Sequence, residues 1–403
     1  MEIHEYQAKE LLAGFGVPVP RGGLAYSPEQ AAYRARELGG ARWYVKAQVH
    51  GGGRSLAGGV VACDDEGEVH AAAEGLFGRR LAVSRGGADG RGVYRVYVER
   101  AVAVARELYL GLALDRRAER VVVLASGRGG VDIEELAARE PATLIRRVVE
   151  PAVGMQAFQA REIAFGLDVD GTLVNAVVDT VLGAYAAFER LDATTVEINP
   201  LAIGEDGALH ALDVRMSFDD SALFRHPEIA ELRDKSQEDP TQTHAIDRGL
   251  GYTALDGDIG CIVTGQGIGR ATRELIEQRG GRLANVLDIG GGASPERVVK
   301  ALRLVLADAR VRTVLVNAFC GINRCDHVAE GLVRAYSASE REVPLIVRLA
   351  GARLAEGRRA LVASGLPLIR AATLTEAVER AVRAASSGAR RASSAAGTDT
   401  DAR

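Results

Sequence analysis

One stretch of the chain, residues 195–220, places oxygen-bearing side chains at a spacing that suits a metal ion. Its sequence, TVEINPLAIGEDGALHALDVRMSFDD, alternates apolar and polar residues around the short loop 205–207, which predicts a β-hairpin. Pairing across that loop sets Asn199 opposite Asp213, with Glu197 on the same face. An amide oxygen beside two carboxylates is a hard-oxygen set that suits Mg²⁺. The alternative is a surface hairpin whose polar side chains face water.

The sequence of this hairpin also predicts one apolar face and one irregularity in the strand pairing. Val196, Ile198, Leu212 and Val214 alternate with the polar residues, so these apolar side chains share the opposite face. Pro200 cannot donate a ladder hydrogen bond, and we therefore expect a strand end or a β-bulge at that residue.

A glycine-rich loop, residues 50–59, offers a second chemical site. It reads HGGGRSLAGG, and its glycines let backbone N–H groups approach phosphate oxygens with no Cβ atom in the way. Lys46, on the preceding strand 43–49, and Arg54 supply positive charge. The loop lacks the GK[ST] ending of a Walker A motif and leads into another strand, 60–62, so we expect a flap over phosphates. The alternative is a mobile hairpin without a ligand.

Lysine is rare in this chain, and its rarity draws attention to Lys46. Only four lysines, at positions 9, 46, 235 and 300, stand among the 50 lysine and arginine residues. A lysine retained where arginine has replaced most others marks a place that needs a compact point charge. We apply that reasoning to Lys46, because of its glycine-rich neighbour, and expect the other three to have survived by chance.

Two glutamates at strand ends are candidates for holding a nucleotide. Residues 93–99 (VYRVYVE) predict a strand that ends at Glu99, and Glu107 lies near the start of the next strand, which pairs with residues 120–125. Carboxylates at these places could bond a ribose, an amino group or a metal ion. The alternative is a solvated charge at a strand end.

The composition excludes several classes of protein. With 47 % hydrophobic and 26 % charged residues the chain has a globular composition, and its length suggests two or three domains. A net charge of −4 and a pI of about 6.1 argue against a nucleic-acid or anionic-membrane surface. No apolar signal core and no run of about 18 apolar residues occurs, so we expect a cytoplasmic location. The cysteines lack CxxC spacing and are expected to be free thiols.

The order of predicted elements changes near residue 240. Before it, helices at 5–15 and 28–38 accompany the strands described above. After it, strands and helices alternate in five βα repeats, which predicts a parallel, doubly wound α/β sheet. The turn 265–269 (GQGIG) is a weak dinucleotide fingerprint and fits better as one of several glycine loops at the carboxyl ends of strands. The Ala- and Ser-rich tail, 386–403, is expected to be disordered.

Taken together, the motifs resemble the β subunits of succinyl-CoA synthetase and malate–CoA ligase from residue 1 to about residue 384. The resemblance rests on MEIHEYQAKELL, VKAQVHGGGR, VEINPL, SFDDSALF, SQEDP, LDIGGGAS and GINRCD. It implies an ATP-grasp domain over residues 1–239, with the glycine-rich loop in a lobe of about residues 20–100. It also implies a flavodoxin-like CoA-ligase domain over residues 240–385 and an α-subunit partner, in an αβ or α₂β₂ assembly.

The resemblance also assigns site residues. The ATP site would comprise Lys46, Gly53, Arg54, Ser55, Glu99, Val102 and Glu107. Mg²⁺ would be held by Asn199 and Asp213. The organic acid would meet Thr264, Gly321, Ile322 and Asn323. No catalytic nucleophile is expected on this chain, because the phosphorylated histidine and most contacts with CoA are expected on the α subunit.

The chemistry implied by the resemblance is a series of three transfers. ATP phosphorylates the partner's histidine, the phosphoryl group passes to a carboxylate, and the CoA thiol displaces phosphate from the acyl phosphate. A carboxylate is a poor acyl donor until one of its oxygens becomes a phosphate leaving group. Lys46, Arg54 and Mg²⁺ would offset the charge on the transferring phosphoryl group.

Some residues depart from the family's pattern. Ser55-Leu56 stand where the family usually has glycine and lysine, and Thr264 stands where it usually has asparagine. Asn323 in GINRCD and Ala350 in VRLAG favour malate–CoA ligase. Because Asn323 and Thr264 can bond a hydroxyl group, we expect activity with malate at least equal to that with succinate.

Two other functions remain open at this level. One is a different ATP-grasp ligase that joins a carboxylate to an amine, although GINRCD and the βα repeats argue against it. The other is a regulatory paralogue that binds nucleotide without turnover, which the altered glycine-rich loop suggests. The expected small-molecule partners are ATP or ADP, Mg²⁺, a dicarboxylate and CoA.

Overall fold

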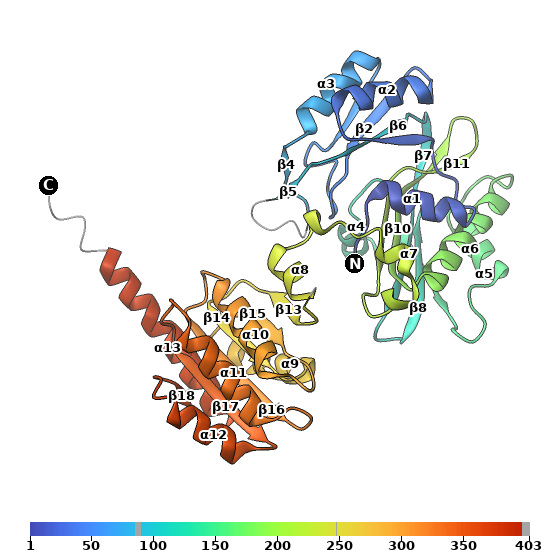
Figure 1. Cartoon of the computed structure of the whole chain (residues 1–403). Coiled ribbons are helices and arrows are strands. Elements are labelled where there is room, and N and C mark those ends of the chain that lie inside the picture. The colour runs from blue at the N-terminus through green and yellow to red at the C-terminus, as the bar shows by residue number, and fades with distance from the viewer. Residues whose placement is uncertain (85–89, 247, 397–403) are drawn as a thin grey trace. The chain divides into compact units, whose positions relative to one another are not determined.

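The computed structural model describes residues 1–84, 90–246 and 248–396. The chain divides into two compact units, Met1–Gln237 and Glu238–Arg403. The first unit holds a four-stranded sheet, a six-stranded sheet and a two-stranded ribbon, and the second unit holds one six-stranded sheet (Figure 1). None of the described helices is both long enough and apolar enough to cross a bilayer.

The four-stranded antiparallel sheet carries the glycine-rich loop. In spatial order its strands are β1 (Gly22–Ala25), β6 (Val96–Arg100), β2 (Trp43–Ala47) and β3 (Val60–Cys63). Helices α2 (Pro28–Leu38) and α3 (Glu66–Leu76) pack on it (Figure 1). The side chain of Ser27 caps the start of α2, where Pro28 stands at a position that needs no N–H donor. The glycine-rich loop joins the neighbouring strands β2 and β3, as expected for a flap between strands.

The six-stranded sheet contains the predicted hairpin. Its strands are β11 (Leu209–Ala211), β10 (Ala193–Gly204), β7 (Val104–Asp115), β8 (Arg120–Ser126) and β9 (Leu144–Val149), with β12 (Val214–Phe218) also paired to β10. Its helices are α1 (Glu5–Gly14), α5 (Ala157–Gly166) and α6 (Val174–Arg190). Val177, Val181, Ala184 and Phe188 recur at helical spacing on α6 and are buried against the sheet, which explains why this helix docks there.

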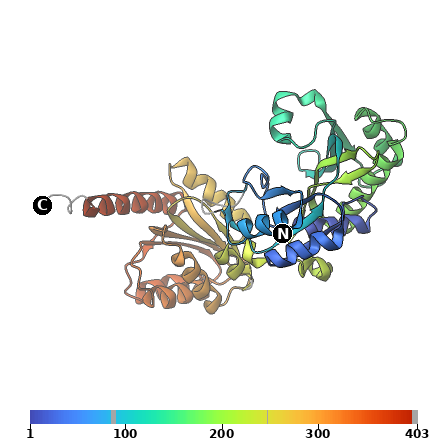
Figure 2. The same cartoon turned by 90° about the horizontal axis from the view of Figure 1, so that it is seen from above.

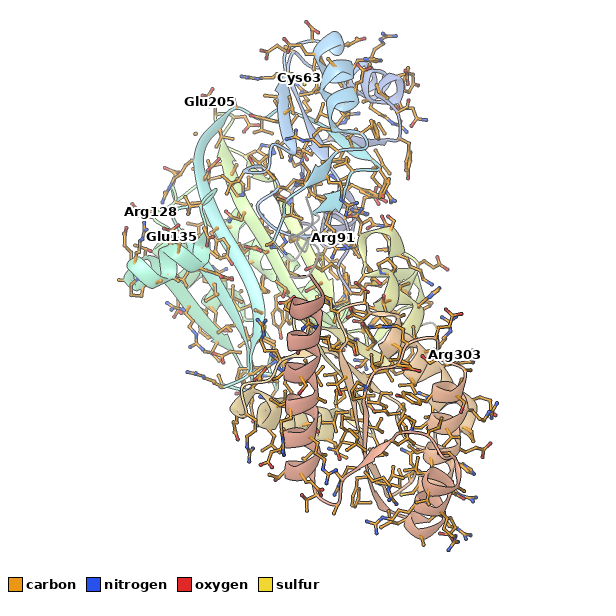
Figure 3. The ribbon with its side chains drawn as sticks, turned by 90° about the vertical axis from the view of Figure 1, so that its left-hand side faces the viewer. Cys63, Arg91, Arg128, Glu135, Glu205 and Arg303 are labelled. Carbon is orange, nitrogen blue, oxygen red and sulfur yellow. The ribbon has the colours of Figure 1, made fainter. Side chains whose placement is uncertain are left out.

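Smaller elements complete the first unit. They are β4 (Arg80–Leu81), β5 (Arg91–Gly92), α4 (Ile133–Arg139) and α7 (Pro227–Ala230). Glu205 marks the outer tip of the β10–β11 turn, and Arg128 and Glu135 lie around α4, beside the same sheet (Figure 3).

The second unit is the predicted doubly wound α/β fold. Its sheet has the order β13 (Gly251–Ala254), β15 (Leu283–Asp288), β14 (Ile259–Val263), β16 (Thr313–Cys320), β17 (Leu345–Gly351) and β18 (Ile369–Arg370). Its helices are α8 (Pro240–Ile246), α9 (Gln266–Gln278), α10 (Pro295–Ala307), α11 (Cys325–Ser337), α12 (Leu354–Ala363) and α13 (Leu374–Ala396). Helices α10, α11 and α12 cover one face, and α9 and α13 cover the other (Figure 2).

Two details of this unit differ from the sequence predictions. The edge strand β13 runs antiparallel to β15 and was missed, because four residues with a single buried side chain give little periodicity. The tail was expected to be disordered from residue 386, but residues 386–396 continue helix α13. Alanine and arginine have high helix propensity, which favours extension of an established helix. Residues 397–403 lie outside the described part of the chain.

Candidate active site

The hairpin has the register that its loop predicts. The backbone N–H of Gly204 donates to the carbonyl of Ala208 at 2.8 Å, and that of Asn199 donates to the carbonyl of Asp213 at 3.0 Å. Asn199 and Asp213 therefore face each other across the hairpin. Glu197 shares their face, whereas Val196, Ile198 and Val214 are buried on the other. Leu212, expected on the apolar face, is only half-buried, because it lies opposite Pro200 in the break between β11 and β12.

The irregularity expected at Pro200 takes the form of a bulge. The pairing of β10 with β7 shifts between Ile198 and Leu201, and the Asn199–Pro200 peptide is cis. Strand β10 nevertheless continues to Gly204, so the alternative of a strand end at Pro200 is wrong. The proline lacks the N–H that the regular ladder would require, and a bulge accommodates that loss.

A cavity of about 450 Å³ lies between the hairpin, the start of the glycine-rich loop and β7. Predicted site residues that line it are Gly53, Arg54, Asn199 and Asp213. Glu197 also lines it, and burial raises the pKa of the Glu197 carboxyl, with Arg215 at 3.5 Å acting in the opposite direction. The hairpin and the loop, two candidate sites in the sequence, thus form the walls of one cavity.

Beside this cavity, six charged side chains, five of them buried, form a cluster, which we call the ion cluster. Its members are Glu5, Lys9, Lys46, Arg54, Glu99 and Asp213. The Lys46 ammonium lies 2.6 Å from Glu99 and 3.1 Å from Glu5, and it donates to the carbonyl of Leu212 at 2.7 Å. Arg54 bonds Glu5, and its Nη2 lies 3.0 Å from Asp213.

Within the ion cluster, neighbouring charges keep Glu5, Lys9 and Arg54 ionised despite their burial. Burial alone would raise the pKa of the Glu5 carboxyl, but Arg54, Lys46 and Lys9 together hold that pKa well below its usual range. Burial would likewise lower the pKa of Arg54, and the carboxylates of Asp213 and Glu5 raise it instead. A charge removed from water is stable only beside a partner of opposite sign. The fold must therefore bring the side chains of the ion cluster together.

The other residues assigned to the ATP site, Ser55, Glu99, Val102 and Glu107, do not line the cavity. The Glu99 carboxylate is bonded to the lysines of the ion cluster, so it does not face the cavity. Ser55 is exposed within the glycine-rich loop, next to Leu56, which is 96 % exposed. Val102 is half-buried in the connection between the two sheets of the first unit, and Glu107 is exposed on β7.

Asn199 connects the hairpin to the loop near Gly130. Its Oδ1 accepts the N–H of Gly130 at 2.7 Å, and its Nδ2 donates to the carbonyl of Val131 at 3.0 Å. Gly130 has φ of 68°, and a Cβ atom there would come within 2.1 Å of the Glu107 carboxylate. Glycine is therefore required at this residue, and the loop brings Glu107 close to Asn199.

The hairpin oxygens fit a magnesium ion that takes its other ligands from water and phosphate. Asp213 is 38 % exposed on the cavity side and uses Oδ1 for Arg54, while Asn199 Oδ1 keeps a second lone pair. Among the residues that the structure describes, no three His, Cys, Asp or Glu side chains are grouped to hold a metal ion. Mg²⁺ does not need such a group, because it binds through one or two carboxylates plus substrate phosphates.

His50, where the glycine-rich loop begins, is buried and lines the cavity. It is 7 % exposed, its Nε2 has no hydrogen-bond partner, and its ring lies 4.7 Å from that of His4. Burial, with a smaller contribution from His4, lowers the pKa of His50 to about 3. The imidazole is therefore neutral at physiological pH.

Acid should destabilise the protein through His50. Its folded pKa is below its unfolded value, so its contribution is complete above about pH 6.5 and is lost as the pH falls. Between pH 7 and pH 5 we expect wild type to lose about 1 to 2 kcal/mol more unfolding free energy than His50→Gln, measured by urea titration. His70→Gln, at a half-exposed surface site, is the matched control. Parallel pH curves for wild type and His50→Gln would contradict this assignment.

In the second unit, two of the residues expected to meet the organic acid make internal bonds. Asn323 is 4 % exposed; its Oδ1 accepts the N–H of Ala293 at 2.7 Å, and its Nδ2 donates to the carbonyl of Gly290 at 2.7 Å. Thr264 Oγ1 accepts the N–H of Phe319 at 2.9 Å and donates to the carbonyl of that residue at 3.0 Å. Both side chains therefore brace loops at the carboxyl ends of the parallel strands.

The remaining residues of this loop edge are open to solvent. Gly321 is exposed, and Ile322 is 85 % exposed. Asp288 was missed by the sequence analysis. Its Oδ1 accepts the N–H groups of Gly265 and Gly290 at 2.7 and 2.8 Å, so it ties two of the glycine loops together. These loops precede helices at the edge where doubly wound sheets bind ligands.

The first unit also contains two site residues that the sequence analysis passed over. Glu5 and Lys9, one turn apart on α1, contribute one charge each to the ion cluster. Lys9 was expected to be one of the lysines retained by chance, and that expectation is wrong: the side chain is 1 % exposed and bonded to Glu5 and Glu99. The rarity of lysine was a usable signal for Lys9 as well as for Lys46.

Comparison with known proteins shows the family to which the chain belongs. The chain matches the ATP-grasp domain family over residues 2–203 and the CoA-ligase family over residues 262–382. It is 56 % identical over 384 residues to a probable malate–CoA ligase subunit β of Mesorhizobium japonicum, covering 95 % of this chain and 98 % of the relative. It is 48 % identical over 385 residues to an ADP-forming succinate–CoA ligase subunit β of Anaeromyxobacter dehalogenans, covering 96 % and 99 %.

A solved structure supports the same architecture. ATP citrate lyase from Methanothrix soehngenii, determined with citrate and coenzyme A, superposes with a TM-score of 0.72 at 19 % identity, covering 95 % of this chain and 99 % of that one. The fold and site thus define an ATP-grasp protein joined to a CoA-ligase domain. More narrowly, the chain belongs to the family of β subunits of ADP-forming malate– and succinate–CoA ligases, which are acid–thiol ligases.

Proposed function

We propose that this chain is the β subunit of an ATP-dependent dicarboxylate–CoA ligase. It would bind Mg²⁺–ATP in the first unit and the organic acid in the second, while an α subunit carries the phosphorylated histidine and most contacts with CoA. The observation that carries this proposal is the ion cluster, in which Lys46 and Arg54 share Glu5 and in which Arg54 and Asp213 line one cavity. Family membership supports the reaction class.

The roles of the residues follow from their charge and position. Arg54 and the backbone N–H groups of the loop around Gly53 would bind phosphate oxygens, with Lys46 supplying a further cation. Asn199 and Asp213 would hold Mg²⁺, which neutralises phosphate charge when bound. Ser55, Glu99, Val102 and Glu107 would complete the nucleotide site in the arrangement that the resemblance implies.

Each transfer in the proposed reaction would form one bond and break one. The γ-phosphoryl group of ATP forms a P–N bond with the partner's histidine as its bond to the bridging oxygen breaks and ADP leaves. That P–N bond then breaks as the phosphoryl group moves to a carboxylate oxygen of the acid. The thiol sulfur attacks the acyl carbon, the C–O bond to phosphate breaks, and inorganic phosphate leaves. In the second unit the acid would lie against the loops of Thr264 and Gly321 to Asn323.

Malate is the acid that we propose first, with succinate also accepted. The support is the higher identity to the relative named a malate–CoA ligase, 56 % against 48 % for the succinate relative. The test is to coexpress the chain with its α subunit and to follow ATP-dependent loss of the CoA thiol with each acid. Thiol loss with neither acid contradicts the proposal. Nucleotide binding without turnover would favour a regulatory paralogue, and turnover with an amine acceptor would favour a carboxylate–amine ligase.

Asn323→Val should impair both acids to a similar degree. Valine leaves the N–H of Ala293 and the carbonyl of Gly290 unpaired, and each buried unpaired group costs about 1 to 3 kcal/mol. If Asn323 bonded the hydroxyl group of malate, as the sequence suggested, the variant would lose malate activity selectively, but the amide already bonds the loop. The measurement is kcat/KM for malate and for succinate. A loss confined to malate would show instead that the Asn323 amide contacts the substrate hydroxyl.

A further inference from the structure

Lys9 and Lys46 bind the same three groups. The Lys9 ammonium lies 2.9 Å from Glu5, bonds Glu99, and donates to the carbonyl of Leu212 at 2.7 Å. Lys46 contacts the same two carboxylates and donates to the same carbonyl, also at 2.7 Å. One lysine comes from helix α1 and the other from strand β2, so the duplication arises from tertiary structure.

The two lysines differ in what else they can reach. Lys9 is 1 % exposed. Neither lysine lines the cavity, but Arg54, which bonds Glu5, does. Lys46 is 6 % exposed, on the strand that leads directly into the glycine-rich loop. A phosphate in the cavity could therefore draw on Arg54 and Lys46, but Lys9 would remain with its carboxylates.

We propose that Lys9 is a positioning residue of the nucleotide site, which keeps Glu5 and Glu99 paired and in place when Lys46 and Arg54 turn toward phosphate. This inference rests on the proposed function, because it takes a phosphate group as the ligand. The ion cluster is balanced, with three cations and three anions. Any cation that it gives to a ligand leaves a carboxylate short of a partner.

Lys9 removes that difficulty because it already bonds both carboxylates. Without Lys9, Lys46 would be the ammonium that balances Glu99, and Lys46 with Arg54 would have to balance Glu5. Moving Lys46 toward a phosphate would then leave a buried, uncompensated carboxylate, which is strongly unfavourable. The loss of Lys9 should therefore weaken nucleotide binding although Lys9 itself never contacts the nucleotide.

The experiment compares Lys9→Met with wild type in the full chain coexpressed with its α subunit. Trp43, the only tryptophan, lies on β2 close to Lys46 and reports on this region by fluorescence. We expect the Kd for Mg²⁺–ADP to rise about tenfold or more in Lys9→Met, and the rise in melting temperature on adding Mg²⁺–ADP to shrink. Lys300→Met, at an exposed place on α10, is the matched control and should bind as wild type does.

A purely structural Lys9 predicts a different pattern. In that case Lys9→Met lowers the melting temperature of the ligand-free protein but leaves the Kd within about twofold of wild type, and this result would overturn the proposal. Should wild type itself fail to bind Mg²⁺–ADP, the proposed function falls and the inference falls with it. Binding by wild type with an unchanged Kd in Lys9→Met overturns the inference alone.

A second variant keeps the test decisive if Lys9→Met does not fold. Glu99→Gln removes one carboxylate, and Lys9→Met/Glu99→Gln then restores the balance of two cations with two anions. We expect this double variant to bind Mg²⁺–ADP within about threefold of Glu99→Gln alone, since the charge that Lys9 compensates is gone. A tenfold loss in that comparison would show that Lys9 acts on the nucleotide by another route.

Discussion

Lys46→Arg is expected to reduce turnover by about a hundredfold, although the positive charge is kept. The ammonium of Lys46 makes three short contacts in a space that leaves only 6 % of the residue exposed. A guanidinium is wider and planar, and it cannot direct three donors at Glu5, Glu99 and the carbonyl of Leu212 as a compact ammonium does. A displaced guanidinium would also approach the start of the glycine-rich loop.

The measurement is kcat and KM for ATP in the αβ complex, together with the melting temperature. Lys300→Arg is the matched control, because it makes the same change at an exposed residue in the second unit. Loss of turnover with a melting temperature near that of wild type would support a role of Lys46 in the reaction. Turnover near the wild-type rate would mean that the space beside Glu99 accepts either cation and that the rarity of lysine does not explain Lys46.

The hairpin could be predicted from the sequence because its information is local. Gly207, with φ of 74°, supplies the left-handed residue that the loop requires, and the alternation of side chains then sets Asn199 opposite Asp213. The same holds for the βα repeats of the second unit, whose apolar strands and glycine loops lie in order along the chain.

The ion cluster could not be predicted in full because five separate segments build it. Glu5 and Lys9 read as an ordinary i, i+4 pair on a helix, and only the docking of α1 brings them to Glu99 and Lys46. Similarly, the sequence cannot distinguish an amide that bonds a substrate from one that braces a loop. The two buried bonds of Asn323 are visible only in three dimensions.

The ion cluster gives each of its cations more than one partner. Each cation contacts two carboxylates and one backbone carbonyl, so a cation that exchanges one carboxylate for a ligand keeps two contacts with the protein. Arg54, for example, bonds the carbonyl of Ala47 at 3.0 Å in addition to its two carboxylates. Arg54 can therefore exchange one of its carboxylate partners for a ligand and still be held in position by its other partners.

Asp213→Asn should weaken the Mg²⁺ dependence of nucleotide binding and leave the fold intact. Asparagine keeps the shape of the side chain but removes the charge that faces the cavity, and Arg54 retains Glu5 and the carbonyl of Ala47. Even outer contacts of a metal site cost about tenfold to a hundredfold in affinity when they are lost. We therefore expect the Mg²⁺ concentration for half-maximal ATP binding to rise by at least about tenfold.

The measurement is a Mg²⁺ titration of ATP binding in the αβ complex, followed by the fluorescence of Trp43. Asp206→Asn is a stringent control, because it makes the same substitution in the same hairpin at the turn, where the side chain is 63 % exposed and does not line the cavity. The control should titrate as wild type does. If Asp213→Asn does so too, Asp213 serves only to orient Arg54, and the metal must be sought at Glu197 and Asn199, which line the same cavity.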